Sequence, residues 1–284
     1  MSKLKPNRVQ FLEYKPAEVD YAAAKFVVLP VPYEATTTYG KGTKNGPAAI
    51  LSASQYVENF DEELWHEPCE EAGIFTGRPV SVGELSGKRV AGVLADNKVP
   101  VILGGEHSIT PLVVRACAEK YKDLSVLQFD AHADLRDTYH GAKDSHACVM
   151  RRVLEICPAV QVGIRSISEE GYEFAKKTGQ LSKIHWAEHL EIADKITTQL
   201  SNNVYITFDV DAFDPAIMPS TGTPEPGGLL WYEALDILKA VCRQKNVVGF
   251  DVTEFSPQKG NRAPDFMIAR LIYKIMGFIG AKNQ

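Results

Sequence analysis

Short runs of apolar, mostly β-branched residues recur along the chain and alternate with longer segments in which apolar positions recur at helical spacing. Near-continuous apolarity is typical of strands that are buried on both faces of a parallel sheet. The runs with this character are 26–31, 99–105, 124–130, 160–166, 203–211 and 247–255. The segments with helical spacing are 109–121, roughly 146–156, 169–178, 229–244 and 265–279.

Strand–helix alternation along the whole chain predicts an α/β fold in which helices cover both faces of one sheet. No repeat, low-complexity tract or linker interrupts the pattern, so we expect a single domain over residues 1–284. Two long loops, 32–47 and 212–228, are rich in Gly, Thr and Pro, and Pro47 is expected in the first turn of a helix. Long loops at the carboxyl ends of strands often hold a ligand.

Composition and charge exclude several classes of function. The 284 residues carry a formal net charge of −5, which disfavours nucleic-acid binding because that needs a basic face. No segment approaches the roughly 20 apolar residues that span a bilayer, and the polar start, residues 1–16, lacks the apolar stretch of a signal peptide. Five scattered cysteines without a CxxC pair are typical of reduced thiols in a cytoplasmic protein. The acidic stretch 61–71 is typical of a solvated surface.

Acidic and histidine residues cluster directly after three of the predicted strands. GGEHS follows the second run, DAHAD the third and DVD the fifth, at 104–108, 130–134 and 209–211. In an extended chain Asp130, His132 and Asp134 would point to the same face. Burying such groups together is costly, and neighbouring carboxylates repel each other, unless a cation compensates them.

The types of side chain in these clusters indicate which metal they would bind. A single Asp at a strand end is usually a cap or turn residue, but six ligand-type residues at three strand ends favour a metal site. A carboxylate-rich set with two imidazoles and no cysteine suits hard divalent ions such as Mn²⁺ rather than structural zinc. Four carboxylates can balance two such ions, and paired metals activate a water between them. The six residues are His107, Asp130, His132, Asp134, Asp209 and Asp211.

At these residues the sequence resembles the ureohydrolase family of arginases, agmatinases and their relatives, and it is most similar to agmatinases. The resemblance runs from about residue 25 to the C-terminus, and its specificity comes from several motifs in the expected order. The motifs are GGEHS (104–108), DAHAD (130–134), SHACVMR (145–151), FDVDAFDP (208–215), TGTPEPGG (221–228) and DVTEFSP (251–257).

The resemblance implies a three-layer α/β/α fold with a central, mostly parallel sheet, two Mn²⁺ ions per subunit and a homo-oligomer, a trimer or hexamer. It also implies how the six residues divide between the ions. His107, Asp130, Asp134 and Asp209 would bind one ion, while Asp130, His132, Asp209 and Asp211 would bind the other. Asp130 and Asp209 would therefore bridge the pair.

The same resemblance implies roles around the reacting carbon. A hydroxide that bridges the metals would attack the guanidinium carbon, which is a poor electrophile because the group is always protonated. Glu254 matches the family carboxylate that hydrogen-bonds the guanidinium, and His146 matches the histidine that shuttles protons. Asp134 could orient the hydroxide through its free oxygen. The alternatives are a strand-end salt bridge for Glu254 and a packing role at a helix start for His146.

Substrate choice rests on two stretches that differ from arginases. The stretch 135–137 (LRD) lacks the arginase-like asparagine, and 163–167 (GIRSI) lacks the arginase acidic pair. The resemblance therefore favours agmatine, cleaved to putrescine and urea in polyamine biosynthesis, and Asp137 or Asp144 could meet its ammonium group. Guanidinobutyrate, arginine, formiminoglutamate and guanidine remain alternative substrates. A catalytically silent, metal-binding oligomer is the alternative of a different class.

Overall fold

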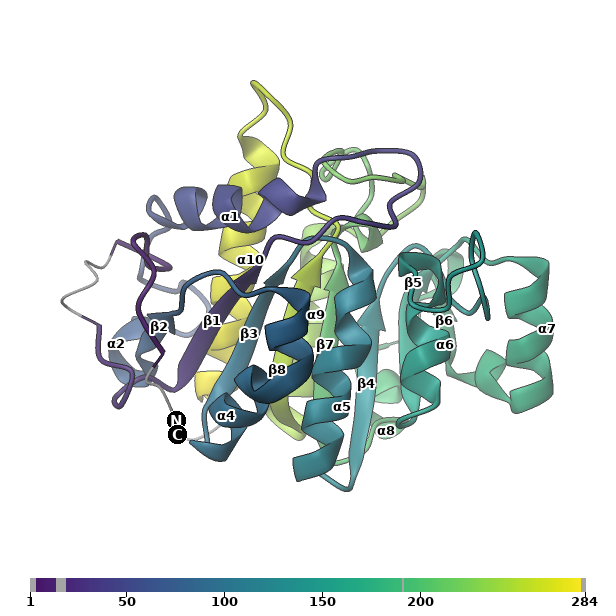
Figure 1. Cartoon of the computed structure of the whole chain (residues 1–284), viewed down its shortest axis with the longest axis horizontal. Helices are drawn as coiled ribbons and strands as arrows, with labels where there is room; N and C mark the ends of the chain where they lie inside the picture. The colour runs from purple at the N-terminus through teal and green to yellow at the C-terminus, as the bar shows by residue number, and fades with distance from the viewer. Residues whose placement is uncertain (1–3, 14–18, 191, 282–284) are drawn as a thin grey trace.

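The computed structural model describes residues 4–13, 19–190 and 192–281, so residues 1–3 and 14–18 of the polar start lie outside the described residues. Within these ranges eight strands form one sheet, ordered β2-β1-β3-β8-β7-β4-β5-β6, and every neighbouring pair is parallel (Figure 1). The strands are β1 (Phe26–Val31), β2 (Ile74–Thr76), β3 (Val99–Gly104), β4 (Leu124–Phe129), β5 (Ala159–Ile164), β6 (Ile184–Trp186), β7 (Asn203–Asp209) and β8 (Asn246–Thr253).

Helices lie on both faces of this sheet and make three layers (Figure 1). They are α1 (Gly46–Ser54), α2 (Pro68–Ala72), α3 (Val82–Glu84), α4 (Val90–Ala95), α5 (Thr110–Lys120), α6 (Val149–Leu154), α7 (Glu169–Thr178), α8 (Ala193–Thr198), α9 (Trp231–Gln244) and α10 (Ala263–Ala281). The three-layer α/β/α architecture expected from the sequence is confirmed, and the sheet is parallel throughout. Pro47 lies in the first turn of α1, as predicted.

Alternation along each strand divides the core in two. In β1, Val28 joins the cluster that packs against α1, α8, α9 and α10, whereas its neighbour Val27 joins the cluster against α4, α5, α6 and α7. Successive side chains of a strand point to opposite faces, so a continuous apolar run is what a strand covered on both sides requires. The strongly apolar runs of the sequence therefore became the inner strands.

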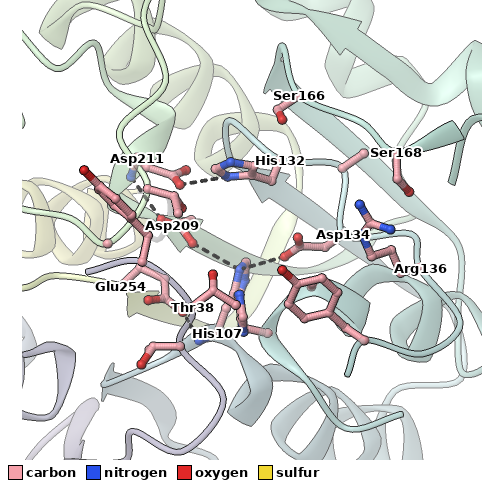
Figure 2. Close-up of a pocket in the computed structure, with 18 of the residues that line it drawn as sticks. Thr38, His107, His132, Asp134, Arg136, Ser166, Ser168, Asp209, Asp211 and Glu254 are labelled. Carbon is pink, nitrogen blue, oxygen red and sulfur yellow. Dashed lines mark hydrogen bonds and ion pairs between the residues drawn. The ribbon is translucent and has the colours of Figure 1, made fainter. Parts of the chain in front are cut away.

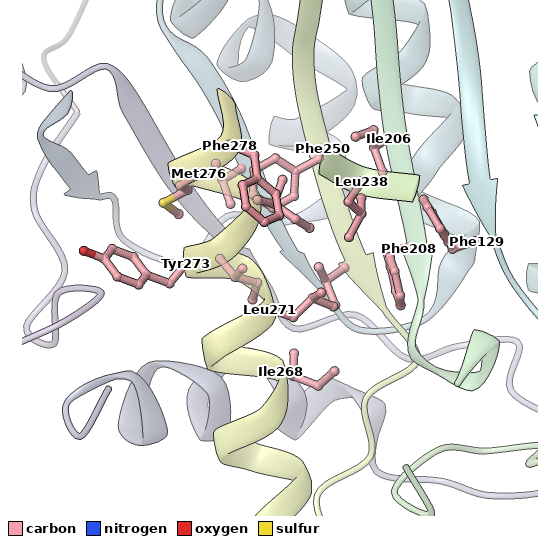
Figure 3. Close-up of a cluster of buried hydrophobic side chains, with 14 of the residues drawn as sticks. Phe129, Ile206, Phe208, Leu238, Phe250, Ile268, Leu271, Tyr273, Met276 and Phe278 are labelled. Atoms are coloured by element: carbon pink, nitrogen blue, oxygen red, sulfur yellow. The ribbon is translucent and has the colours of Figure 1, made fainter. Parts of the chain in front are cut away.

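The larger of the two clusters is built around α10. Its side chains, among them Leu271 and Phe278, gather over Phe250 of β8 and Phe208 of β7 (Figure 3). Phe208 stacks on Phe129 of β4 with ring centroids 4.8 Å apart. Although α10 is 19 residues long and mostly buried, no helix in the described ranges is long and apolar enough to cross a membrane.

Two kinds of sequence prediction were incomplete or wrong. The pattern missed the short elements, which are three to six residues long and too short to display a period. They are β2, β6, α2, α3, α4 and α8. The expectation of a solvated surface for 61–71 is wrong at Asp61, which is fully buried. Its carboxylate lies 3.1 Å from the Lys274 ammonium group on α10, and a partner so distant in sequence is invisible to a local count of charges.

The strand order places a switch point in the middle of the sheet. The chain runs directly from β3 to β4, yet β8 and β7 lie between these two strands. At such a point the loops that leave the strands diverge and open a crevice beyond the carboxyl ends, which is where open α/β sheets bind ligands. The loops after β3, β4, β7 and β8 carry the three clusters and Glu254.

Candidate active site

The six residues that the sequence predicts as metal ligands converge at this crevice, and Figure 2 labels all of them except Asp130. His107 begins a short 3-10 helix (His107–Ile109) after β3. Asp209 is the last residue of β7, and Asp211 lies in the 3-10 helix that follows (Val210–Ala212). The segment 130–134 follows β4 directly. Three separate stretches of sequence therefore supply one site.

Around His107, three carboxylates surround a single ring nitrogen. His107 Nδ1 lies 3.2 Å from Asp130 Oδ2, 3.3 Å from Asp209 Oδ2 and 3.5 Å from Asp134 Oδ2. This nitrogen is buried and makes no hydrogen bond, although three oxygens lie so close to it. A buried lone pair that converges with carboxylates in this way is the arrangement expected of metal ligands.

The second group forms around His132. Its Nδ1 lies 2.9 Å from Asp211 Oδ2 and 3.6 Å from Asp130 Oδ1. Asp130 thus presents one oxygen to each histidine, and His107 and His132 mark two neighbouring positions that share this carboxylate. One carboxylate between two such positions matches the bridging role that the resemblance implies for Asp130.

The electrostatics of the site fit a pair of divalent cations. Burial and the charges of neighbouring carboxylates raise the pKa of Asp134, Asp209 and Asp211. Although burial opposes a charged imidazole, Asp211 and Asp130 raise the pKa of His132 to about 12. So much buried negative charge needs positive charge beside it, and two divalent cations between the carboxylates would supply it.

A buried hydrogen-bond chain fixes which nitrogen of His107 faces the carboxylates. His107 Nε2 lies 2.7 Å from Thr207 Oγ1, and the Thr207 hydroxyl donates to Asp251 Oδ1 at 2.6 Å. Because that hydroxyl has only one proton, Nε2–H must donate to Thr207, which leaves the Nδ1 lone pair free. Tyr205 and Thr110 also donate to Asp251, so this carboxylate is held from three sides.

Two residues of the site adopt strained backbone conformations. Asp134 has φ 50° and Glu254 has φ 61°, in the left-handed region that side chains other than glycine seldom occupy. The extended geometry expected for 130–134 is therefore wrong, because β4 ends at Phe129 and the chain then turns. The three side chains still converge, but the turn brings them together rather than strand alternation.

Glu254 lies beside the carboxylates, directly after β8. Its Oε1 accepts a 2.7 Å hydrogen bond from the His107 backbone N–H, and its own N–H donates to Gly105 O. Burial raises the pKa of Glu254 to about 8. Gly105 itself packs closely against the loop after β1, since a Cβ there would lie 1.9 Å from Tyr33 O. Glu254 therefore lies in the lining of the crevice, and among the described residues it does not form the strand-end salt bridge that was its alternative.

The crevice holds a cavity of about 200 Å³ that His146 and Glu254 both line. The wall away from the carboxylates is made of hydroxyl groups, aromatic rings and one cation: Thr37, Thr38, Tyr39, Arg136, Tyr139, Ser166, Ser168 and Thr223. Asp137 and Asp144 are not among the described residues that line it. Asp137 instead forms an ion pair with Arg152, with Nη2 2.7 Å from Oδ1. The geometry therefore gives no support to Asp137 or Asp144 as the partner of a substrate ammonium group.

Arg165 is a residue whose role the sequence did not reveal. Its guanidinium donates to the backbone carbonyls of Asp211, Glu225 and Gly163 at 2.7, 2.8 and 3.0 Å. It thereby ties the long loop after β7 to the end of β5. The only sequence signal was an arginine two residues after a glycine at a strand end, which does not predict that the arginine holds the two loops together.

Comparison with known proteins agrees with this site. The family model described as the arginase family matches residues 24–277. The chain belongs to the arginase family. It is an arginase-family ureohydrolase of the agmatinase-like kind, a hydrolase that acts on the C–N bonds of linear amidines. The family resemblance noted from the motifs is therefore confirmed over almost the whole chain.

Individual relatives show which members of the arginase family this chain is similar to. The chain is 40% identical to the N(1)-aminopropylagmatine ureohydrolase of Synechocystis sp. over 97% of its own length and 95% of that protein. It is 33% identical to the agmatinase of Pyrococcus horikoshii, with 91% and 93% covered. The solved structure of the agmatine ureohydrolase of Thermoplasma volcanium superposes with a TM-score of 0.81 at 29% identity and covers 98% of this chain and 95% of that one.

Proposed function

We propose that this protein hydrolyses a linear guanidino-amine to urea and the corresponding amine, using two Mn²⁺ ions held by the six converging residues. The observation that carries the proposal is the convergence of two histidines and four aspartates at one cavity, which Glu254 and all six of them except Asp130 line. When bound, two divalent cations would lower the pKa of a water held between them and so supply a nucleophile at neutral pH. A set rich in carboxylates, without cysteine, suits Mn²⁺.

The protein's own residues would bind and orient the guanidinium. Glu254 faces the carboxylate cluster, so its negative charge can hold the planar, permanently protonated group by paired hydrogen bonds. A guanidinium held in this way would lie next to the residues that would hold the ions, and such orientation favours attack on its carbon. Asp134, with one oxygen near His107, could accept a hydrogen bond from the attacking water and direct its lone pair.

His146 would move the proton that the leaving amine needs. It lines the cavity from a short 3-10 helix (His146–Cys148), and burial lowers its pKa. An imidazole can take a proton from solvent and pass it on near neutral pH, which is the function of a general acid–base group. His146 and Glu254 line the same cavity, so a substrate held by Glu254 would lie within the space that His146 also contacts.

We propose N1-aminopropylagmatine as the preferred substrate, with agmatine as the slower one. The stretch 163–167 lacks the acidic pair of arginases and brings Ser166 and Ile167 into the cavity lining, so this part of the wall offers no carboxylate for an α-amino group. The Synechocystis relative with 40% identity bears that name, whereas the Pyrococcus agmatinase is 33% identical. The expectation of agmatine from the sequence therefore stays in the proposal, but as the second choice.

A panel of guanidino compounds tests this function with the Mn²⁺-loaded protein. We expect urea release from N1-aminopropylagmatine with kcat/KM at least about tenfold above that for agmatine, a difference of about 1.4 kcal/mol. Arginine and guanidinobutyrate should give no more urea than the buffer does. Faster turnover of arginine would contradict the proposed substrate class, and bound metal without urea from any compound would favour the catalytically silent protein.

We also infer that the protein is a cytoplasmic homo-oligomer, a trimer or hexamer. Tyr56, Trp65 and Tyr232 are each more than 70% exposed, and large exposed aromatic side chains often mark contact surfaces. All five cysteines lie within the described residues, are buried and form no disulfide, which suits a reducing compartment. Light scattering on a size-exclusion column should give three or six times the 31.3 kDa of one chain, and the mass of a single chain would contradict this inference.

A further inference from the structure

Thr36 lies in the loop between β1 and α1 and contacts His146, which is 110 positions later in the chain. Neither the motifs nor the proposed reaction assigns this residue a role. The loop carries it to the edge of the cavity, where Thr37 and Thr38 form part of the wall. The geometry around the Thr36 hydroxyl shows what the residue does there.

The side chain of Glu106 holds Thr36 in place by hydrogen bonds. This side chain is fully buried and accepts hydrogen bonds from the backbone N–H groups of Ala35 and Thr36 at 2.5 and 2.6 Å. The hydroxyls of Ser108 and Thr36 donate to it as well, at 2.6 and 2.7 Å. Four donors around one side chain leave it acting only as an acceptor, as a carboxylate does. The turn at Thr36 is therefore fixed to the end of β3.

The Thr36 hydroxyl oxygen lies within hydrogen-bond distance of three groups but carries only one proton. Its hydroxyl donates to Glu106 Oε1, and it accepts a 3.0 Å hydrogen bond from the His146 backbone N–H. His146 Nδ1 lies 3.1 Å away. Since the single hydroxyl proton already points to Glu106, the contact with Nδ1 is a hydrogen bond only if Nδ1 carries a proton and donates it.

We propose that Thr36, held by Glu106, is a positioning residue that fixes the neutral ring of His146 as the Nδ1–H tautomer, with Nε2 left to exchange protons in the cavity. In the described residues no hydrogen bond reaches Nε2, so that nitrogen is the one available to substrate and solvent. This inference rests on the proposed role of His146, because a fixed tautomer matters only if that ring transfers protons. In other proteins, a carboxylate that is hydrogen-bonded directly to a proton-transferring histidine holds its ring in one tautomer. Here the Thr36 hydroxyl, placed between a carboxylate and the imidazole, would have the same effect.

Without Thr36, the remaining contacts of the ring would not fix the same tautomer. Ser145 Oγ lies 3.4 Å from Nδ1, too far for a strong hydrogen bond, and it could act as donor or acceptor. The rings of Tyr139 and His146 pack edge-to-face with centroids 5.7 Å apart. This contact limits the tilt of the His146 ring but does not favour protonation of either nitrogen. The Thr36 hydroxyl is therefore the contact that distinguishes the two nitrogens.

Substitution of Thr36 tests the proposal against matched variants. Thr36→Val keeps the shape and removes the hydroxyl, and we expect kcat to fall roughly 10- to 100-fold with KM and metal content little changed, since a positioned acid–base group contributes about 10²–10⁴-fold. Thr36→Ser restores a hydroxyl and should recover activity to within about threefold of the natural protein. Thr198→Val, the same exchange at an exposed position on α8, should change nothing.

Two further measurements separate positioning from a structural role. In a His146→Ala background, Thr36→Val should have no further effect on kcat, because the two residues act as one unit. A crystal structure of Thr36→Val should show the His146 ring rotated away from its natural position. An undisturbed ring with natural kcat, or equal losses in both backgrounds, overturns the proposal. If the natural protein releases no urea from any guanidine, the proposed function fails, and the crystal structure still decides the positioning.

Discussion

Replacing Asp130 with Asn is expected to abolish urea release and to leave the purified protein with little bound metal. This carboxylate presents Oδ2 to His107 and Oδ1 to His132, so both cation positions would lose a charged ligand at once. Gln128 Nε2 and the His132 backbone N–H each donate to it at 2.6 Å, so an amide NH₂ in either orientation would face a donor. We expect a loss of about 10³-fold or more, at least that of a deleted oxyanion donor.

Urea release and metal content measured on the same preparations give this result directly. Asp236→Asn makes the identical chemical change on the exposed face of α9 and should retain full activity and metal. Cys117→Ala alters a thiol buried in the core and should likewise leave metal content and activity intact, whatever it does to stability. A fully active, metal-replete Asp130→Asn protein would contradict the assignment of the ligands.

Glu254→Gln is expected to lower kcat/KM by about 10²–10³-fold while the protein keeps its metal. Glutamine retains a carbonyl oxygen that can accept the 2.7 Å hydrogen bond from the His107 backbone, so the lining of the crevice should keep its shape. What disappears is the negative charge that would hold the guanidinium. The loss should therefore appear in the reaction and not in the bound metal.

Steady-state kinetics with metal analysis distinguish this outcome from a structural defect. Glu119→Gln, on the exposed side of α5, provides the matched exchange and should behave as the natural protein does. If Glu254→Gln lost its metal, the residue would be supporting the ligand His107 rather than the substrate. If it kept natural kinetics, the role proposed for Glu254 would be wrong.

The inner strands could be predicted from the sequence because burial on both faces leaves a plain signal. The run 203–211 is apolar until Asp209, and the structure ends β7 at that residue. The edge strands β2 and β6 could not be predicted, because three residues with one neighbouring strand need little apolar character. The layers of the fold could therefore be predicted from the apolar pattern. The edge strands depend on contacts between residues far apart in the sequence, which a short stretch of sequence does not reveal.

The residues of the site were also predictable, but part of their geometry was not. Acidic and imidazole side chains at three strand ends were enough to select His107, Asp130 and Asp209. In the structure, His107 Nδ1 lies 3.2 Å from Asp130 Oδ2 and 3.3 Å from Asp209 Oδ2. The alternation argument for 130–134 selected residues that do converge, but its geometry was wrong, because β4 ends at Phe129 and Asp134 adopts a left-handed conformation. The contacts of Thr207 with Asp251 join separate strands, and no spacing in the sequence encodes that pairing.

The backbone pairing of the segment after β4 bears on how substrates could change within this fold. Main-chain atoms alone join His132 to Ser166: Ala133 N–H donates to Ser166 O, and Ser166 N–H donates to Ala131 O, both at 2.9 Å. Ser166 and Ser168 both line the cavity, and neither side chain takes part in this pairing, although Ser168 Oγ accepts the N-cap hydrogen bond of α7 from Gly171. Exchange of the Ser166 side chain can therefore alter which molecule fits while the reactive centre stays assembled, and descendants of one ancestral enzyme could acquire new preferences by such a step.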